Sequence, residues 1–593
     1  MTQNSNAPSI RRGMSRYRFF SLCPRRPLLF ALGAAIAACA LYNGPLAESA
    51  CNEVAFAACV LVALIVAMIA LSGRVAFGLI AGSAPMLLLE AVARLKFRYL
   101  GTPLLAPDLI YYVNAQILAT LIRYPVIVAV TVAALILVPG ALILAWFGDR
   151  KPAARWRTRI ARVVGVIAGV VMLIIAMNPH GPFAAVQAKG MWLAMNDDSF
   201  VSDFLTSFRS THVAAPRYDL ADASHFDWRD DAAQTAIATQ VKPDIVVVLE
   251  ESTFDPRMLA VCTSPLCDRR MFHADANTIA NGFLEVHTWG GGTWTTEFAF
   301  LTGLPHDLFG PAGIYAPFNL APRIHYTLAR ALRADGYRTV AIYPTDGDFL
   351  NGRAAYTDYD FDAFYGGEQV GLGWHSSDAD LMRAFARVFA IEKTKAHGAP
   401  VFLFMLTLHQ HGPHMTPLRD LSSPYDKPLF SGRIARDKAL DDWLNLNLGN
   451  YLQRLDESDR AEATLEEMLR KDDRPVLLAH FGDHQPSFDG AINALQKRLP
   501  VRVADPAVVT YYMMKGFNMP INQPIRRADY PVLDIAFLGS LLMDAAGLRK
   551  DAFFTANALL RERCHGHDVD CRNAALLRSW RAEVFGDLHD LGD

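Results

Sequence analysis

The stretch DIVVVLEESTFDP, residues 244–256, decides the fold of the second half of this 593-residue chain. Its apolar run shows no polar alternation, which is typical of a strand buried on both faces of a sheet. Glu250 and Glu251 follow directly at the end of that run. In open α/β sheets, ligands bind where the strands end at their carboxyl edge. The stretch therefore predicts a buried strand that delivers carboxylates to a site.

Further apolar runs follow, and amphipathic stretches separate them. The runs are GFLEVH at 282–287, RTVAIYP at 338–344, VFLFML at 401–406, PVLLAHF at 475–481 and VVTYYMM at 508–514. The main stretches between them, 323–336, 380–393 and 458–471, carry apolar residues at the i, i+3, i+4 spacing of helices. This alternation predicts a C-terminal α/β domain whose mostly parallel sheet is covered by helices on both faces.

Polar residues follow these strands at the predicted sheet edge. They lie in EESTFDP (250–256), TWGGGTWTTEF (288–298), TDGDFLNGR (345–353), TLHQHGPH (407–414) and GDHQP (482–486). One such ending could be an ordinary turn, but several endings at one edge bring carboxylates, histidines and hydroxyls together. These groups are ligands suited to Mn²⁺ or Zn²⁺, and a hydroxyl on such a cation is drawn toward alkoxide.

The stretch TWGGGTWTTEF is predicted to hold the nucleophile. Its glycines allow close approach of the backbone to a ligand, and the helix that starts there offers N–H groups to phosphoryl oxygens. A hydroxyl at that point could attack a phosphodiester and hold the phosphoryl group covalently. Thr295 and Thr296 are interpreted as helix-start residues, and Trp289 and Trp294 as walls of the site. The pattern predicts metal-assisted phosphoryl or sulfuryl transfer.

The first half of the chain is predicted to cross a membrane five times. Five apolar stretches have the length of about 20 residues that a bilayer requires: 27–47, 50–71, 74–93, 123–147 and 159–177. The predicted organisation is a basic N-terminus at 1–26, a transmembrane region at 27–177, a linker with an amphipathic helix at 178–240 and a catalytic domain at 241–593. The formal net charge of −2 gives no argument for nucleic acid as a partner.

The distribution of basic residues predicts how the spans are oriented in the membrane. They gather before the first span, at Arg74 between the second and third, and at 150–159 between the fourth and fifth, so these segments are expected in the cytoplasm. An odd number of spans then exports the catalytic domain. Segment 94–122, which contains TPLLAPDLIYY, is interpreted as an interfacial or re-entrant element. We expect a multi-pass protein of a Gram-negative inner membrane, with a cytoplasmic N-terminus and a periplasmic catalytic domain.

Eight cysteines fall into two groups. Cys23, Cys39, Cys51 and Cys59 lie in or beside the spans, where a free thiol behaves as a small hydrophobe. The exported half carries two close pairs, Cys262/Cys267 and Cys564/Cys571, which predict two local disulfides in an oxidising compartment. A zinc site in CHGHDVDC, residues 564–571, is the alternative.

The order Glu-Ser, Gly-Thr-x-x-x-Glu-Phe, FLNGR, HGP and Gly-Asp-His resembles the alkaline phosphatase/sulfatase superfamily, and within it the lipoteichoic acid synthase-type phosphoglycerol transferases. The resemblance covers nearly the whole chain, and its most specific pieces are GGGTWTTEF and FGDHQP. It implies that Thr293 is the nucleophile and a metal ligand. It also implies metal ligation by Asp483, His484 and Glu251, with Glu250 as the fallback for the glutamate.

The resemblance further implies a substrate-binding set. Arg353, with Asn351 beside it in FLNGR, corresponds to an arginine that contacts the substrate phosphate, although Gly352 interrupts the family spacing. His411 corresponds to a substrate-side histidine, and His409 and His414 are close competitors. The implied cofactor is one divalent metal, Mn²⁺, with Zn²⁺ and Mg²⁺ as alternatives. The implied donor is phosphatidylglycerol, and the acceptor is a glycan or a lipid.

Other functions remain open at this point. A phosphoethanolamine transferase acting on lipid A or a polysaccharide would share the five spans and the disulfides, but its nucleophile segment does not resemble Thr-x-x-x-Glu-Phe. A sulfatase-like phosphodiesterase or hydrolase is a further alternative. A true sulfatase needs Cys or Ser in a Cys/Ser-x-Pro-x-Arg context, which Cys262 does not provide. A non-catalytic binding or sensor protein is disfavoured by intact Glu, Thr, Asp and His at four strand ends.

Overall fold

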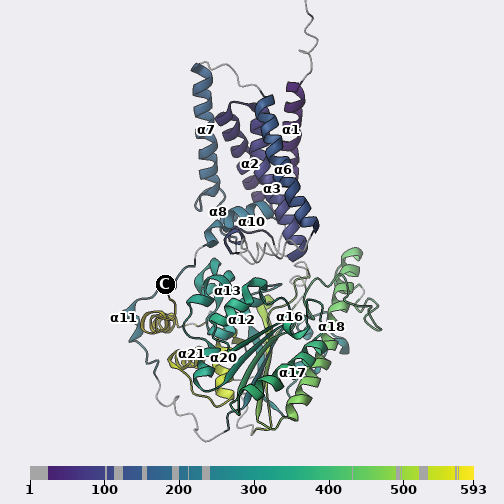
Figure 1. Cartoon of the computed structure of the whole chain (residues 1–593), viewed down its shortest axis with the longest axis vertical. Coiled ribbons are helices and arrows are strands. Elements are labelled where there is room, and N and C mark those ends of the chain that lie inside the picture. Colours follow the sequence, from purple (N-terminus) through teal and green to yellow (C-terminus); the bar gives the residue numbers. More distant parts are fainter. Residues whose placement is uncertain are drawn as a thin grey trace, which may run out of the picture. The chain divides into compact units, whose positions relative to one another are not determined.

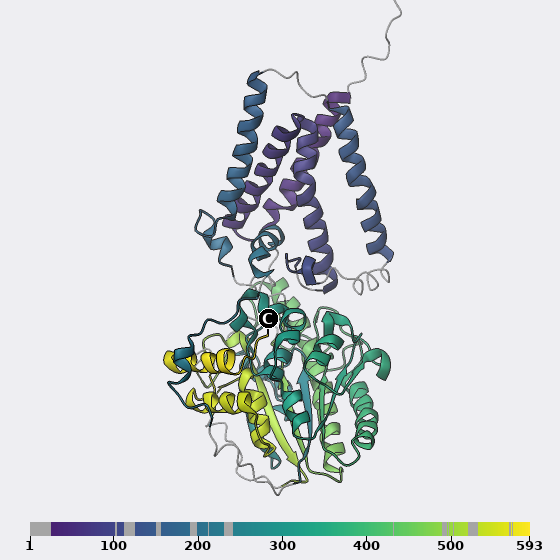
Figure 2. The same cartoon turned by 60° about the vertical axis from the view of Figure 1, so that its left-hand side comes forward.

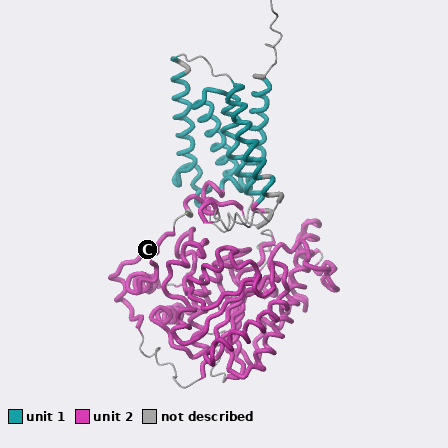
Figure 3. Tube along the Cα trace, viewed as in Figure 1, with its two compact units in different colours: residues 1–95, 121–188, 199–202 teal, residues 96–120, 189–198, 203–593 magenta. Residues whose placement is uncertain are grey.

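A computed structural model describes most of the chain, in two compact units (Figure 3). The described residues are 25–100, 103–111, 125–149, 156–189, 199–211, 213–229, 241–430, 432–488, 495, 497–501, 503–519, 530, 532–567, 571 and 573–592. Unit 1 comprises residues 1–95, 121–188 and 199–202, and unit 2 comprises residues 96–120, 189–198 and 203–593. The predictions for the basic N-terminus, Cys23, residues 112–122, the basic residues at 150–155 and the tether at 230–240 lie outside the described residues.

Unit 1 contains the predicted spans. The long helices are α1 (Arg25–Asn43), α2 (Cys51–Ser72), α3 (Val75–Leu100), α6 (Pro125–Gly148) and α7 (Trp156–Met177), and α3 runs on into unit 2 (Figures 1 and 2). Five of the described segments are long and apolar enough to cross a membrane, as predicted: Pro27–Ala47, Cys51–Ser72, Val75–Phe97, Thr131–Gly148 and Arg159–Met177. The chain is therefore a multi-pass membrane protein.

Small residues let α2 and α7 approach closely. A side chain at Gly169 would meet the Ala63 carbonyl at 2.9 Å, and one at Gly165 would meet the Ala70 methyl at 2.9 Å. This is the small-residue packing by which membrane helices associate, because apolar surface alone gives no driving force in lipid. On the same pair, Arg162 donates from Nε to the Ala70 carbonyl at 2.8 Å.

Unit 2 is built on one eight-stranded sheet in the order β4-β3-β5-β1-β6-β7-β2-β8. The strands are β1 (Asp244–Glu250), β2 (Thr278–Glu285), β3 (Arg338–Tyr343), β4 (Ala363–Gly366), β5 (Val401–Leu406), β6 (Val476–Gly482), β7 (Val509–Phe517) and β8 (Val532–Asp534). Only the β7 pairings, with β6 and β2, are antiparallel, so the other seven strands run in one direction. The predicted mostly parallel sheet is confirmed; β4 and β8 were not predicted because they are too short to give a pattern.

Helices cover both faces of this sheet, as predicted (Figure 1). Alternate side chains of β1 divide between two cores, since successive strand residues point to opposite faces. Ile245, Val247 and Leu249 pack with α12 (Thr293–Thr302), α14 (Leu328–Ala334), α20 (Leu538–Ala545) and α21 (Ala552–Arg563). Val246 and Val248 pack with α17 (Asp378–Lys395) and α18 (Lys438–Arg470). Helix α18 is much longer than the predicted 458–471, because an apolar face with Leu444, Leu448 and Leu452 continues it toward its N-terminus.

Two local disulfides close loops of unit 2. They join Cys262 to Cys267 and Cys564 to Cys571, which confirms the predicted pairing. The zinc site considered in CHGHDVDC is wrong, because both of its cysteines are consumed by the second disulfide.

Candidate metal and nucleophile site

Parallel pairing of β1 and β6 brings two predicted ligands together. Glu250, the last residue of β1, lies opposite Gly482, the last residue of β6. Glu251 and Asp483 are therefore the first residues beyond two neighbouring parallel strands, at the carboxyl edge. Gly482 must be glycine, because a Cβ there would lie 1.7 Å from the Thr253 carbonyl oxygen. The Asp483 amide donates back to the Glu250 carbonyl at 3.1 Å and closes the edge.

His484 turns one ring nitrogen into the same cluster. Its Nδ1–H donates to the Gln485 carbonyl at 3.0 Å, so Nε2 is the nitrogen left with a lone pair. Nε2 lies 3.4 Å from Glu251 Oε1 and 3.3 Å from Asp483 Oδ2. Ligand atoms of Glu251, Asp483 and His484 all lie within 4.8 Å of one another, and all three residues are buried. We call this set the Glu-Asp-His cluster.

The nucleophile loop places Thr293 against this cluster. Gly290 and Gly292 have φ angles of 67° and 89°, which are strained for any residue with a side chain. The Gly290 amide donates to the Gln485 carbonyl at 2.8 Å, and the Thr296 hydroxyl donates to the Asp483 carbonyl at 2.8 Å. Thr293 begins α12, and its hydroxyl donates to Glu251 Oε2 at 2.9 Å and lies 3.5 Å from His484 Nε2.

The hydroxyls of the other two threonines of the stretch donate hydrogen bonds to backbone carbonyls. The Thr295 hydroxyl donates to the Gly292 carbonyl at 2.7 Å, and the hydroxyl of Thr296 is the one that holds Asp483. Both are fully buried, as expected of helix-start residues. Thr293 is half-buried, and it is the threonine whose hydroxyl donates to Glu251 of the cluster.

Burial and neighbouring charges shift the pKa values of all three residues in the cluster. Burial would raise the pKa of Glu251, but the nearby His411 and His484 and the hydrogen bonds from Ser252 and Thr293 lower its pKa below the usual range. Burial and the neighbouring Glu251 hold the pKa of Asp483 well above its usual range. Burial lowers the pKa of His484, which keeps the imidazole neutral. A cation between the two carboxylates would relieve their repulsion.

One orphaned oxygen shows that the residues fit a cation. Asp483 Oδ1 accepts from the Ser252 and His484 amides at 2.6 Å each. Oδ2 is buried and accepts no hydrogen bond of ordinary geometry among the described residues, although the Thr293 hydroxyl lies near enough to lower the pKa of Asp483. An unpaired buried carboxylate oxygen is costly unless a cation or proton meets it. Two carboxylates, a neutral imidazole and a hydroxyl form a donor set that suits Mn²⁺ or Zn²⁺.

Glu250, the fallback ligand, turns elsewhere. It receives the Thr407 hydroxyl at 3.3 Å, and burial together with Asp378 and Glu462 raises its pKa well above its usual range. Its carboxylate thus belongs to a second, buried group of acids beneath the site.

The three candidate histidines of TLHQHGPH separate in the structure. His411 lies near enough to Glu251 and His484 for its charge to lower the pKa of both. Its Nδ1–H donates to the Gly412 carbonyl at 2.6 Å, and its ring lies edge-on to Trp374 at 4.6 Å. His409 instead pairs with Glu457 at 2.7 Å. His414 donates to the Gln410 carbonyl at 2.7 Å and is buried between Tyr451 and Phe488.

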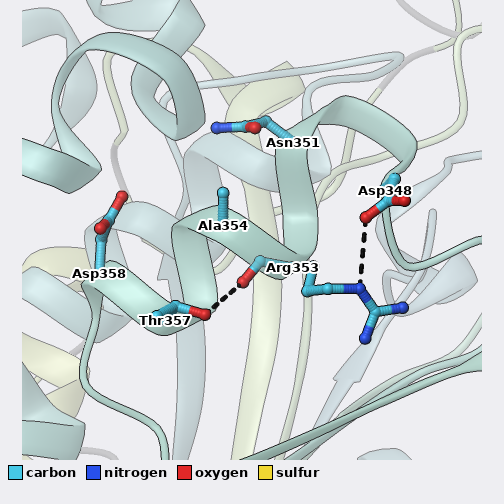
Figure 4. Close-up of a pocket in the computed structure, with 6 residues that line it drawn as sticks. All are labelled: Asp348, Asn351, Arg353, Ala354, Thr357 and Asp358. Atoms are coloured by element: carbon cyan, nitrogen blue, oxygen red, sulfur yellow. Dashed lines mark hydrogen bonds and ion pairs between the residues drawn. The ribbon is translucent and has the colours of Figure 1, made fainter. Parts of the chain in front are cut away.

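Arg353 and Asn351 lie in a separate pocket of about 310 Å³, which they line with Asp348, Thr357 and Asp358 (Figure 4). Arg353 donates to Asp348 at 3.2 Å, pairs with Glu368 and stacks on the ring of Phe364. Asn351 points away from it and donates to the Pro317 carbonyl at 2.7 Å. No residue of the Glu-Asp-His cluster is among the contacts of Arg353 in the described part of the chain. The structure therefore does not bring these two predicted substrate residues to the cluster.

Sequence reasoning missed several residues that shape the site. Ser252, with a φ of 49°, donates from its hydroxyl to Glu251 Oε1 at 2.8 Å. The Thr407 hydroxyl accepts from the Glu251 amide at 3.0 Å. Tyr356 donates to Glu297 at 2.9 Å, and burial raises the pKa of that glutamate to about 7. The Ser in Glu-Ser and the Thr directly after β5 were visible signals, whereas nothing local pointed to Tyr356.

Comparison with known proteins finds a matching family profile for the domain that carries this geometry. The sulfatase family profile matches residues 243–510. An uncharacterized protein of Haemophilus influenzae is 27% identical over 510 residues, which cover 84% of this chain and 87% of that protein. The "Putative cyclic beta-1,2-glucan modification protein" of Rhizobium meliloti is 25% identical over 385 residues, which cover 61% of this chain and 55% of that protein.

Among solved structures, the Streptococcus pyogenes phosphoglycerol transferase GacH in complex with sn-glycerol-1-phosphate aligns with a TM-score of 0.46 and 14% identity. The alignment covers 64% of this chain and 94% of that chain. The sheet, the strand-end ligands and the family match agree on one conclusion. Residues 243–510 match the sulfatase family profile and form a sulfatase-like α/β domain within a multi-pass membrane protein.

Proposed function

We propose that this protein transfers a phosphoglycerol group from phosphatidylglycerol, through a covalent phosphothreonine at Thr293, to an extracytoplasmic glycan or lipid acceptor. The observation that carries the proposal is the Thr293 hydroxyl, 2.9 Å from Glu251 and 3.5 Å from His484, at the N-terminus of α12. A hydroxyl held beside three potential metal ligands and a helix N-terminus suits attack on a phosphate.

The proposed cofactor is one divalent cation, Mn²⁺, with Zn²⁺ and Mg²⁺ as alternatives. Glu251, Thr293, Asp483 and His484 would hold it, and when bound it would polarise the hydroxyl and stabilise negative charge on the phosphoryl oxygens. The chain's own residues fix the rest. Gln485 holds His484 in the tautomer that presents Nε2, and the GDH turn holds the loop that carries Thr293.

The proposed reaction has two steps that balance. Thr293 Oγ1 gives up its proton and bonds to the phosphorus of the donor, while the bond from phosphorus to the diacylglycerol oxygen breaks and the departing oxygen takes up one proton. An acceptor hydroxyl then gives up its proton and bonds to the same phosphorus, while the bond from phosphorus to Thr293 Oγ1 breaks and Oγ1 takes up one proton. His411, on the open side of the cluster, is the proposed group that faces the substrate.

Phosphoglycerol is favoured over phosphoethanolamine by the Gly-Thr-x-x-x-Glu-Phe pattern at the nucleophile, while the two disulfides favour the second slightly. Disulfides also support an oxidising compartment, hence the periplasmic side of an inner membrane. The relative of Rhizobium meliloti is named for glucan modification, which supports a glycan as the acceptor.

The test uses purified full-length protein in vesicles with phosphatidylglycerol labelled in its headgroup glycerol, in parallel with labelled phosphatidylethanolamine. We expect diacylglycerol release and a covalently labelled enzyme with phosphatidylglycerol, and neither with Thr293→Ala. Thr295→Ala is the matched control and keeps the label, because its hydroxyl serves the helix start.

Three outcomes would change the proposal. Label from phosphatidylethanolamine alone would assign the phosphoethanolamine alternative. Release of free glycerol phosphate in the presence of every acceptor tried would assign a hydrolase. A covalent label that survives Thr293→Ala would refute the nucleophile itself.

A further inference from the structure

A segment between two membrane spans folds as part of unit 2. Residues 103–108 are buried there, although they follow the span Val75–Phe97 and precede the span Thr131–Gly148 in sequence. They lead into the short helix α4 (Asp108–Tyr111). We call residues 103–111 the inter-span strap.

Asp108 is the hub of the strap. It is 3% exposed, and its Oδ2 accepts from Lys96 Nζ at 2.7 Å and from the Leu105 amide at 2.6 Å. Its Oδ1 accepts from the Tyr315 hydroxyl at 3.3 Å. A buried carboxylate with three donors fixes the strap in one conformation, because leaving any of them unpaired would be costly.

The strap also packs against the residue next to the proposed nucleophile. Leu105 shares an apolar cluster with Ile314, Tyr315 and the partly buried Trp294. The Trp294 indole N–H donates to the Ile314 carbonyl at 2.5 Å, so its ring is held in place. Tyr111 stacks on Tyr315 with ring centroids 5.0 Å apart. One cluster therefore connects the strap to the turn that carries Thr293.

The outer side of the strap is apolar. Leu109 and Ile110 are 49% and 57% exposed, although they directly follow the buried Asp108. Phe208 is 49% exposed and belongs to the same part of unit 2, since the neighbouring Ser207 accepts from the Ala106 amide at 2.8 Å. Exposed apolar side chains are ordinary when scattered, but Leu109 and Ile110 lie on a segment that the spans on either side tie to the membrane.

We propose that the inter-span strap is a membrane-contact site of the sulfatase domain, in which Leu109 and Ile110 enter the phospholipid surface. Asp108 and the Trp294 cluster then keep the Thr293 turn at a fixed distance from the bilayer. This inference rests on the proposed function, because a lipid donor gives that distance its purpose. The phosphate of a membrane phospholipid is covalently tied to its acyl chains, so the nucleophile must meet it at the interface.

The first test compares two donors with the double variant Leu109→Gln/Ile110→Gln in full-length protein. We expect turnover of phosphatidylglycerol in vesicles to fall about tenfold, as two half-exposed aliphatic side chains lose their burial in lipid. Turnover of glycerophosphoglycerol, the water-soluble deacylated donor, should not change. Leu446→Gln, on an equally exposed leucine of α18, is the matched control for surface polarity. Equal loss on both donors, or no loss on either, would overturn the proposal.

The second test needs no activity. Ile110→Cys and Leu446→Cys carry a nitroxide label in a background in which Cys23, Cys39, Cys51 and Cys59 are serine. In vesicles, the label at 110 should be relaxed by oxygen more than by a water-soluble nickel complex, and the label at 446 should show the reverse. Aqueous accessibility at 110 would refute membrane contact, even if the transferase activity were confirmed. Lipid accessibility at 110 without any transferase activity would leave the contact standing and refute only the proposed function.

Discussion

The Glu-Asp-His cluster and the Arg353 pocket both lie beyond strand ends of one sheet, yet they differ in how far their side chains are already positioned for a ligand. The cluster is buried, its imidazole tautomer is set by a backbone carbonyl, and the proposed nucleophile Thr293 is already hydrogen-bonded to it. Arg353 is 37% exposed at its side chain and is neutralised by Asp348 and Glu368. The difference indicates that the proposed metal and nucleophile centre is preorganised, whereas phosphate recognition by Arg353 would require its ion pairs to exchange.

The largest expected effect is on the Glu-Asp-His cluster. Glu251→Gln removes the carboxylate that receives the Thr293 hydroxyl, so we expect metal affinity and transfer activity to fall by at least about 100-fold. Glu250→Gln is the matched control. The Glu250 side chain points to Thr407, so this substitution should leave metal affinity within a few-fold of the unmodified protein. Calorimetric titration of each purified variant with Mn²⁺ and Zn²⁺ measures metal affinity, and release of diacylglycerol from phosphatidylglycerol measures transfer activity. A larger loss in Glu250→Gln than in Glu251→Gln would reverse the ligand assignment.

The preorganised cluster is also the part that sequence predicts best. The apolar runs before Glu251 and Asp483 predicted that both residues lie at one sheet edge, and the family resemblance named them as ligands. The structure adds that their strands are direct neighbours. Thr293 was separable from Thr295 and Thr296 only through the spacing to Glu-Phe, and the structure adds the reason that the other two hydroxyls hold backbone carbonyls. The five spans followed from length and hydropathy alone.

Contacts between loops that are far apart in the chain could not be predicted from the sequence. The sequence marked TPLLAPDLIYY as an interfacial or re-entrant element, but it did not predict the contact between Asp108 and Tyr315, because a partner 207 positions away in the chain leaves no local pattern. Arg353 shows the converse limit: FLNGR resembles a family segment, yet the side chain contacts its own loop and Glu368 rather than the cluster. A motif gives the residue type, while its ion pairs depend on charges elsewhere in the fold.

An intermediate effect is expected on the Arg353 side, and it tests whether the loop must rearrange. Arg353→Ala should lower kcat/KM about 10- to 100-fold, the value of charge-assisted hydrogen bonds to phosphate, without changing metal affinity. Glu368→Gln removes a competitor for the guanidinium, so KM for the donor should fall by a few-fold while kcat holds. Steady-state kinetics in mixed micelles of fixed donor fraction give both parameters. If Arg353→Ala leaves kcat/KM intact, the Arg353 pocket is not part of the donor site.

The smallest expected effect concerns His414, a buried histidine in the same segment as His411. Burial and the nearby Arg454 lower the pKa of His414 to about 3, so this ring is neutral in the folded protein and donates to Gln410. An unfolded histidine binds a proton below its ordinary pKa of about 6.5, whereas folded His414 does not bind one until far lower pH. Its contribution to stability is therefore complete above about pH 6.5 and declines as the pH falls, by about 2 kcal/mol at pH 5.

His414→Phe should flatten that pH dependence, because the phenyl ring keeps the contacts with Tyr451 and Phe488 and cannot titrate. It should also lower stability at pH 7, because the Gln410 carbonyl loses its donor. Thermal unfolding of the detergent-purified protein between pH 5 and pH 8 measures both changes, and exposed His225→Phe serves as the control. His306, whose pKa burial lowers to about 4, adds a parallel acid sensitivity that persists in the variant. If the decline in stability below pH 6.5 is as steep in His414→Phe as in the unmodified protein, His414 is not a neutral buried support, and the rigidity of the cluster must come from elsewhere.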